Sequence, residues 1–184
     1  MSYHCNTCGA IHPERPTCFA AEMPVVVSQM SPSDRERRVE LSSDQCILDD
    51  EHFFVLGTLD LPVRGSDEVI RWIVWSTLSR PSFERSSELW SVEGRESEPP
   101  YFGWLSNQIP GFPDSLNIKL RVHTEPLGLR PRLEVLDEEH PLWDAQHNGV
   151  SSDQADDLIH VALCNDAPHG LPHEGADDTR APSR

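Results

Sequence analysis

The chain has 184 residues, of which 37% are hydrophobic, and 31 acidic against 15 basic side chains give it a net charge of −16. This length and composition are typical of one globular domain, and no stretch approaches the ~18 apolar residues that a membrane-spanning helix needs. The acidic balance disfavours direct binding to nucleic acid or to an anionic membrane, because both would be repelled.

The first residues, MSYHCNTCGA, contain no apolar run of the kind that forms a secretion signal. We therefore expect a cytoplasmic protein. In that compartment the five cysteines would be reduced thiols or metal ligands rather than disulfides.

The negative charge is concentrated toward the C-terminus. Residues 133–179 contain twelve Asp or Glu and neither Lys nor Arg. A field of this kind attracts a basic partner, and we predict that any protein partner is basic. The alternative interpretation is an acidic region that only keeps the protein in solution.

In the N-terminal half, residues 31–41 are predicted to contain the start of a helix, because Ser31 can cap it and Pro32 fits its first turn. Residues 44–63 contain two apolar runs separated by DDEH, which is typical of a β-hairpin. Residues 68–78 form a longer and nearly continuous apolar run, which predicts a strand covered on both faces.

Residues 79–90 are predicted to form a short helix with Phe83 and Trp90 directed toward the core. The stretch 116–123 alternates strictly between apolar and polar residues, which indicates a strand with one face in solvent. A further short strand is predicted over 132–136.

The C-terminal part is predicted to be helical and then irregular. Residues 140–150 are typical of a helical turn that ends at Gly149, and 151–164 form an acidic helix capped by a serine. Residues 165–184 are aperiodic and rich in Pro, Gly and Asp, so we expect a disordered tail.

The spacing Cys5-x2-Cys8 is that of the zinc knuckle, in which two thiolates converge on one metal ion. A closed structural site needs two further ligands, and we predict Zn2+ held by Cys5, Cys8, His12 and Cys46. Cys18 is the main alternative for the fourth position, and Cys46 could also be an ordinary buried cysteine. A redox role for the pair is less favoured, because the surrounding sequence lacks the strand–helix setting of redox CxxC motifs.

No catalytic residues are predicted, since the sequence contains no phosphate-binding loop, nucleophile elbow or Ser/His/Asp set. Two regions could nevertheless bind a ligand. One is the aromatic loop after residue 101, and the other is the solvent face of the 116–123 strand together with a nearby arginine. The candidate binding residues are Trp104, Asn107, Lys119, Arg121, His123 and Arg130.

Several stretches together resemble a known family. They are CNTCGAIH, ERRVELSSDQCILD, FFVLGTLDLPV, WIVWSTLSRPSFER, YFGWLSNQIPGFPDSLNIKLRVH, RPRLEVL and HPLWDAQHNGV. In this order, from about residue 3 to residue 150, the chain resembles the bacterial domain-of-unknown-function family 2199. The resemblance implies a single cytoplasmic domain with an N-terminal CxxC knuckle, and it implies no particular activity.

These observations predict an α+β fold. We expect a mostly antiparallel sheet of about five or six strands, with packed helices and an N-terminal CxxC zinc knuckle at one edge. Residues 1–150 would form this domain, followed by the acidic helix 151–164 and the tail 165–184.

The leading functional hypothesis is a non-enzymatic, zinc-stabilised interaction domain whose acidic C-terminal half binds a basic protein, as an inhibitor or immunity-type protein would. The alternative hypothesis is an enzyme or small-ligand-binding domain that uses the Trp104–Asn107 loop and the Arg121/His123 strand face. The sequence leaves the oligomeric state open.

The zinc hypothesis predicts close to one equivalent of zinc in protein purified without chelator, measured by elemental analysis. Cys8→Ser should lower the thermal unfolding midpoint markedly, because zinc binding at a structural site is coupled to folding. Metal-free protein with an unchanged midpoint in the variant would contradict the hypothesis.

Overall fold

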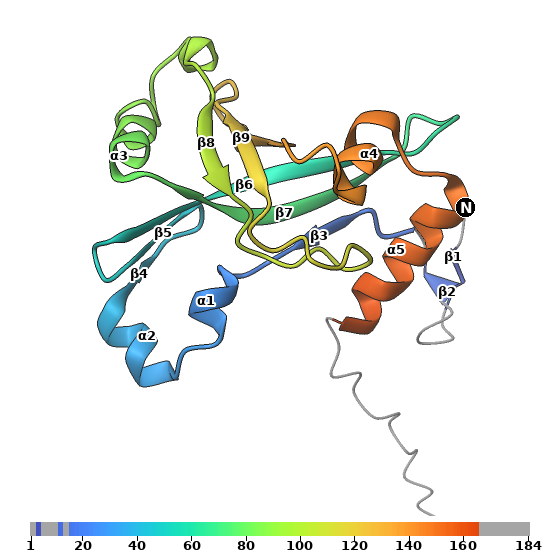
Figure 1. Ribbon diagram of the computed structural model, residues 1–184, viewed down its shortest axis with the longest axis horizontal. Coiled ribbons are helices and arrows are strands. Elements are labelled where there is room, and N and C mark those ends of the chain that lie inside the picture. Colours follow the sequence, from blue (N-terminus) through green and yellow to red (C-terminus); the bar gives the residue numbers. More distant parts are fainter. Residues whose placement is uncertain (1–2, 5–10, 13–14, 166–184) are drawn as a thin grey trace, which may run out of the picture.

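The computed structural model describes residues 3–4, 11–12 and 15–165 (Figure 1). Its strands are β1 (Tyr3–His4), β2 (Ile11–His12), β3 (Cys18–Ala20), β4 (Val39–Leu41), β5 (Gln45–Leu48), β6 (His52–Pro62), β7 (Val69–Leu78), β8 (Tyr101–Trp104), β9 (Lys119–His123) and β10 (Arg132–Val135). Its helices are α1 (Val25–Ser28), α2 (Pro32–Arg38), α3 (Arg80–Glu88), α4 (Pro141–Asn148) and α5 (Ser152–Asn165), with one 3-10 turn at Arg95–Ser97.

The main sheet is built around the β6–β7 hairpin, whose strands pair from Phe53↔Leu78 to Pro62↔Val69. The order is β3-β7-β6-β10-β9-β8, and the β4–β5 pair is attached to the first half of β6. Strands β3 and β10 run parallel to β7 and β6, and the other pairs are antiparallel. The α+β class is therefore confirmed, but the sheet is mixed.

The sheet curls so that its last strand returns to β7. Leu105, immediately after β8, forms an antiparallel bridge with Ser76, and the Ser106 amide donates to the Trp75 carbonyl at 2.8 Å. Gly103 permits this approach, because a Cβ there would collide with Ser76 Oγ and the Thr77 carbonyl oxygen. The 101–108 region is thus held against the centre of the fold.

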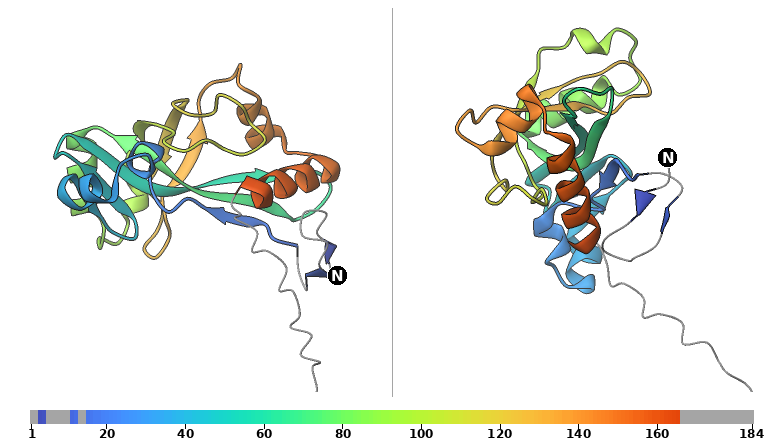
Figure 2. Two further views of the ribbon diagram at one scale, coloured as in Figure 1. Left: turned by 90° about the horizontal axis from the view of Figure 1, so that it is seen from below. Right: turned by 90° about the vertical axis from the view of Figure 1, so that its right-hand side faces the viewer.

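The two faces of β7 bury different residues, as the continuous apolar run predicted. Ile70, Trp72 and Val74 belong to the larger core, which also includes residues of α3, α4 and α5. Trp75 lies in a second cluster beneath α1, together with Cys46 of β5. Figure 2 shows α1 and α5 at separate places along the sheet, in keeping with these two cores.

Helices α2 and α3 each begin at a serine whose side chain caps them. Ser31 Oγ accepts from the Asp34 amide at 3.1 Å, and Ser79 Oγ accepts from the Ser82 amide at 3.3 Å. Each cap is followed by proline within the first two helical positions, where its missing N–H costs nothing. The predicted hairpin over 44–63 and the strand over 68–78 are confirmed as β5–β6 and β7.

Four local expectations differ from the structure. The strand predicted over 116–123 begins only at Lys119, because Asn117 has a left-handed backbone with φ 63°. The stretch 31–41, predicted to contain the start of a helix, is helical only as far as Arg38, because the next three residues form β4. Trp90 was expected in the core, but its side chain is 38% exposed. Its ring lies against the Arg95 guanidinium. Strand β8 was not predicted, because its four residues lie in a stretch that reads as irregular.

Asn107 is a structural residue. Its Oδ1 accepts from the Trp75 amide at 2.8 Å, and its Nδ2 donates to the Met23 carbonyl at 2.9 Å. It therefore ties the segment before α1 and the loop after β8 to strand β7, and its side chain is buried.

Asn107→Ala should reduce the free energy of unfolding by about 2 to 4 kcal/mol, because it leaves a buried amide and a carbonyl without partners. Chemical denaturation would measure the change. Gln29→Ala, which removes an exposed amide, is the control and should change stability by less than about 0.5 kcal/mol. Equal stability of the two variants would contradict this role.

Candidate functional site

The strand face predicted to bind a ligand is neutralised by its own neighbours. Glu134 of β10 lies opposite Arg121 of β9, and its two oxygens lie 3.2 Å from Arg121 Nη1 and 2.5 Å from His123 Nε2. Burial alone would raise the pKa of Glu134, but the hydrogen bond from His123 and the charge of Arg121 outweigh it and lower that pKa. The strand face is therefore a cross-strand ion-pair network.

The other predicted binding residues do not converge on a common site. Arg130 Nε pairs with Asp44 at 2.6 Å. Trp104 is exposed on β8 and packs edge-to-face against Phe102, while Asn107 is buried and structural. Of the predicted set, Lys119 alone is a base without an ion pair in the described part of the chain.

The predicted zinc ligands are only partly described. Cys5 and Cys8 lie outside the described residues, and His12 belongs to β2, where it pairs with Tyr3. Over residues 3–4, 11–12 and 15–165, no group of three His, Cys, Asp or Glu residues is arranged to hold a metal ion. The zinc site at Cys5 and Cys8 thus stays a prediction.

Cys46, the fourth predicted ligand, lies in β5. It pairs with Phe54 near the start of β6, whereas β1 and β2 lie at the opposite end of the molecule (Figures 1 and 2). Its side chain is fully buried among apolar residues, and this burial raises the pKa of the thiol to about 11.

Cys18 lies nearer to the N-terminal hairpin. Cys18 pairs with Arg71 of β7, which in turn pairs with Asp60 of β6. Cys46 pairs with Phe54 of β6, so the two cysteines lie six residues apart along that strand. This separation corresponds to about 20 Å along the strand, whereas zinc–sulfur bonds are about 2.3 Å long. Cys18 is exposed and stays the alternative to Cys46 for the fourth ligand, because Cys5 and Cys8 lie outside the described residues.

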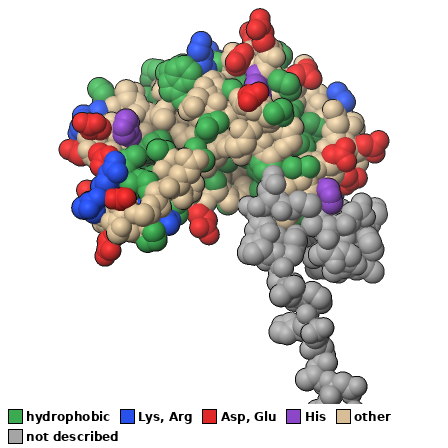
Figure 3. All heavy atoms as spheres, turned by 60° about the horizontal axis from the view of Figure 1, so that its bottom comes forward, with side chains coloured by type: hydrophobic (Ala, Val, Ile, Leu, Met, Phe, Trp, Pro, Cys, Tyr) green, Lys and Arg blue, Asp and Glu red, His purple; other side chains and the backbone are tan. Residues whose placement is uncertain are grey.

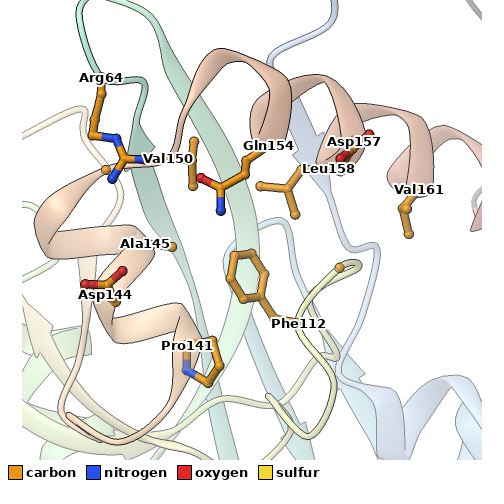
Figure 4. A pocket seen from close by; sticks show the side chains of 12 residues that line it. Arg64, Phe112, Pro141, Asp144, Ala145, Val150, Gln154, Asp157, Leu158 and Val161 are labelled. Atoms are coloured by element: carbon orange, nitrogen blue, oxygen red, sulfur yellow. The ribbon is translucent and has the colours of Figure 1, made fainter.

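A concave site lies between α4 and α5 (Figure 4). It is a cavity of about 450 Å³, which falls within the range of small-molecule sites. Two helical faces and the loop before β9 form its walls. The lining residues are Arg64, Gly111, Phe112, Pro141, Asp144, Ala145, Gly149, Val150, Gln154, Asp157, Leu158 and Val161.

Helical periodicity explains how α5 builds its wall. Gln154, Asp157, Leu158 and Val161 are spaced at i, i+3, i+4 and i+7, so they share one helix face. That face is directed toward the ring of Phe112, which Figure 4 shows in the middle of the cavity.

The turn between the helices is fixed to the end of the β6–β7 hairpin. The Arg64 amide donates to the Val150 carbonyl at 2.8 Å, and the Val150 amide donates to the Pro62 carbonyl at 2.9 Å. Gly149 has φ +76°, and a Cβ there would meet the Pro62 carbonyl oxygen at 2.9 Å. Glycine is therefore required at this turn, which brings Arg64 to the rim of the cavity.

The charged side chains of the cavity, Arg64, Asp144 and Asp157, are exposed to solvent and have few partners within the described chain. Arg64 has no side-chain partner among the described residues, and the same holds for the carboxylate of Asp157. Asp144 accepts a single hydrogen bond, from Asn148 Nδ2 at 2.6 Å. In Figure 4, Arg64 and Asp144 lie toward one end of the cavity and Asp157 toward the other.

Around this cavity the surface is acidic. Figure 3 shows acidic and basic side chains interleaved at one end of the molecule and acidic side chains predominating at the α5 end. Apart from Asp156, which pairs with Arg15 at 2.7 Å, the carboxylates of this end have no ion pair within the described residues. They are Asp137, Glu138, Glu139, Asp144, Asp153 and Asp157.

The comparison with known families decides what kind of chain this is. A family model described as an uncharacterized protein conserved in bacteria (DUF2199) matches residues 4–150. The chain belongs to the DUF2199 family. No curated protein and no solved structure matches this DUF2199 chain, and none of the helices in its described part is long and apolar enough to cross a membrane.

The matched range of DUF2199 ends at Val150, so it includes α4 and Arg64 but not α5. Sequence reasoning did not find this cavity. Arg64 lies in a turn and Phe112 in an irregular loop, and no motif links them to α5. The sequence feature that could have indicated the cavity is one face of the 151–164 helix, which carries the polar Gln154 and Asp157 beside the apolar Leu158 and Val161.

Glu134→Gln should lower the free energy of unfolding by about 1 kcal/mol at pH 7, as expected for a partly exposed ion pair. Because the pKa of Glu134 is lowered on folding, its contribution is present above the ordinary value of 4.5 and is lost as the pH falls below it. Denaturation from pH 3 to pH 7 should show the difference shrinking at acid pH. Glu93→Gln, an exposed carboxylate without an ion pair in the described chain, is the control; a constant difference would contradict the network.

Proposed function

We propose that this chain is a non-enzymatic, zinc-stabilised binding domain whose acidic α4–α5 end docks a basic protein partner. An inhibitor or immunity-type protein that neutralises a basic target is one concrete form of this function. The proposal places the protein in the cytoplasm, where its cysteines are reduced thiols or metal ligands.

The observation that carries the proposal is the difference between the two ends of the molecule. At the α2–β5 end, Arg38 pairs with Asp49 and Arg80 with Asp50, so positive and negative charges alternate. At the α4–α5 end, Asp137, Glu138 and Glu139 precede α4 without a base beside them in the described chain. Such a one-signed surface speeds association with a basic partner and selects against acidic ones.

Apolar contacts must supply most of the affinity, because exposed ion pairs contribute little individually. Leu142 is unsuited to this purpose, since it is fully buried in the core, and Trp143 stacks on His147. The apolar floor of the cavity, formed by Phe112, Leu158 and Val161, is better placed to receive a side chain of the partner.

The alternative function, ligand binding on the Arg121/His123 strand face, has less support. Arg121 and His123 are both bound to Glu134, so an incoming anion would have to compete with a carboxylate already in place. The exposed pair Phe102 and Trp104 remains accessible on that side, but the charged groups beside it are compensated.

The test is a comparison of two variants with the same charge change. Asp137→Asn/Glu138→Gln/Glu139→Gln removes charge from the acidic end, and Glu36→Gln/Glu40→Gln/Glu51→Gln removes it from exposed, unpaired positions at the other end. Each protein would be immobilised and exposed to bacterial lysate at low and at raised salt. Basic proteins retained at low salt should be lost from the first variant and kept by the second.

Association rates of the retained protein would complete the measurement. They should fall severalfold in the acidic-end variant, and the salt dependence should weaken with them. Equal retention and equal salt slopes in both variants would show that the acidic end is not the docking surface.

A further inference from the structure

Arg64 is an exception among the arginines of this protein. Every other arginine in residues 15–165 has a hydrogen-bond or ion-pair partner, whether a carboxylate, a backbone carbonyl or, for Arg35, the sulfur of Met23. Arg64 has no such partner among the described residues, and its exposed side chain lies at the rim of a cavity that the exposed Asp144 and Asp157 also line. Opposite charges that border the same cavity without pairing leave room for a ligand that carries both charges.

We propose that the α4–α5 cavity binds a free basic α-amino acid of the arginine or lysine class. The Arg64 guanidinium would bind the α-carboxylate, for which its planar fork is well matched. Asp144 would accept from the α-ammonium group at the same end, and Asp157 would accept from the cation at the far end of the ligand side chain. This site goes beyond the proposed docking of a basic protein.

The charge balance of the cavity favours this class. One guanidinium and two carboxylates give the lining a net charge of −1, which complements the single net positive charge of free arginine or lysine. The open oxygen of Asp144 and the unpaired carboxylate of Asp157 supply acceptors for both cationic groups. A metal ion is not favoured, because the two carboxylates lie at different ends in Figure 4.

The dimensions of the cavity agree with an extended ligand. Arg64 is fixed beside Val150, and Asp157 lies seven residues further along the chain, most of them in α5. At ~1.5 Å per helical residue, the backbone positions of Val150 and Asp157 lie about 10 Å apart along the helix. This backbone separation is comparable with the length of an extended basic amino acid.

The middle of the cavity suits the aliphatic part of such a ligand. Phe112 and Leu158 are mostly buried and present their remaining surface to the cavity, and Val161 continues the apolar strip along α5. Gln154 Oε1 accepts from the Ser151 amide at 2.9 Å, and its exposed Nε2 has no hydrogen-bond partner among the described residues. Figure 4 shows this amide directed toward Phe112, where it can orient the ligand.

Isothermal titration calorimetry of the full chain with L-arginine and L-lysine tests the proposal. Both should bind, whereas agmatine, which lacks the carboxylate, and citrulline, which lacks the side-chain charge, should bind at least about tenfold more weakly. Absence of binding by arginine and lysine up to ~10 mM, or equal binding of citrulline, would overturn it.

Variants separate the two charged ends of the site. Arg64→Ala should weaken arginine binding about tenfold and leave agmatine binding unchanged, and Asp157→Asn should weaken arginine binding while leaving citrulline binding unchanged. The controls are Lys119→Ala and Asp153→Asn, which remove the same charges from positions outside the cavity and should stay within twofold of the unmodified protein. Loss of arginine binding in the control variants would overturn the proposed site. Because the binding of two ligands is measured for each variant, a folding defect would be recognised by the loss of binding of both ligands.

Two further measurements distinguish a free amino acid from the end of a protein chain as the ligand of the cavity. A peptide that ends in arginine lacks the α-ammonium group for Asp144, so it should bind more weakly than the free amino acid, and binding of the peptide alone would overturn the proposal. The acidic-end variant changed at residues 137–139 does not alter the cavity lining, so it should bind arginine normally even where protein docking is lost. Failure of one proposal is therefore distinguishable from failure of the other.

Discussion

The β6–β7 hairpin is the constraint on which the rest of the fold depends. Its ten paired positions are apolar enough on both faces that each face must be covered. The free edge of β6 carries β5 along its first half and β10 along its second half. The free edge of β7 carries β3 and, further along, the residue after β8. Every strand of the main sheet is thus placed, directly or through one neighbour, by the register of this hairpin.

The two ends of the hairpin have different surroundings. At the end where β6 begins, short turns bring arginines next to aspartates, and the Arg80 guanidinium also lies 4.6 Å from the centre of the Phe53 ring. At the turn end, the hairpin receives the α4–α5 connection through the Val63↔Val150 bridge. Arg15 neutralises Glu68 and Asp156 there, but nothing in the described chain compensates the residues before α4. The acidic surface and the cavity therefore both arise because the α4–α5 connection is attached to the turn end of the hairpin.

The sequence predicts the parts of this structure that depend on local pattern. The long apolar strand, the hairpin before it and the serine-capped helices all follow from periodicity and capping. The parallel placement of β10 beside β6 could not be predicted, because Arg132↔Thr58 is a tertiary register with no local signal. For the same reason the binding site predicted at Arg121 and His123 was not found. In the sequence these residues form an unpaired basic strand face, but in the fold β10 places Glu134 opposite them. Arg64 looks like an ordinary turn residue until α5 is placed beside it.

Helix α5 lies outside the range matched by the DUF2199 family, yet it is part of the core. Ala155, Ile159 and Ala162 are buried against the sheet, so removing the helix would expose apolar surface that residues 15–150 do not cover. Arg15 fixes the helix from the other side, because its single guanidinium joins Asp156 to the β6–β7 turn. The cavity takes one wall from this helix and the other from α4. Ligand binding there would consequently depend on a helix outside the matched family range, attached to a hairpin and a turn that lie within it.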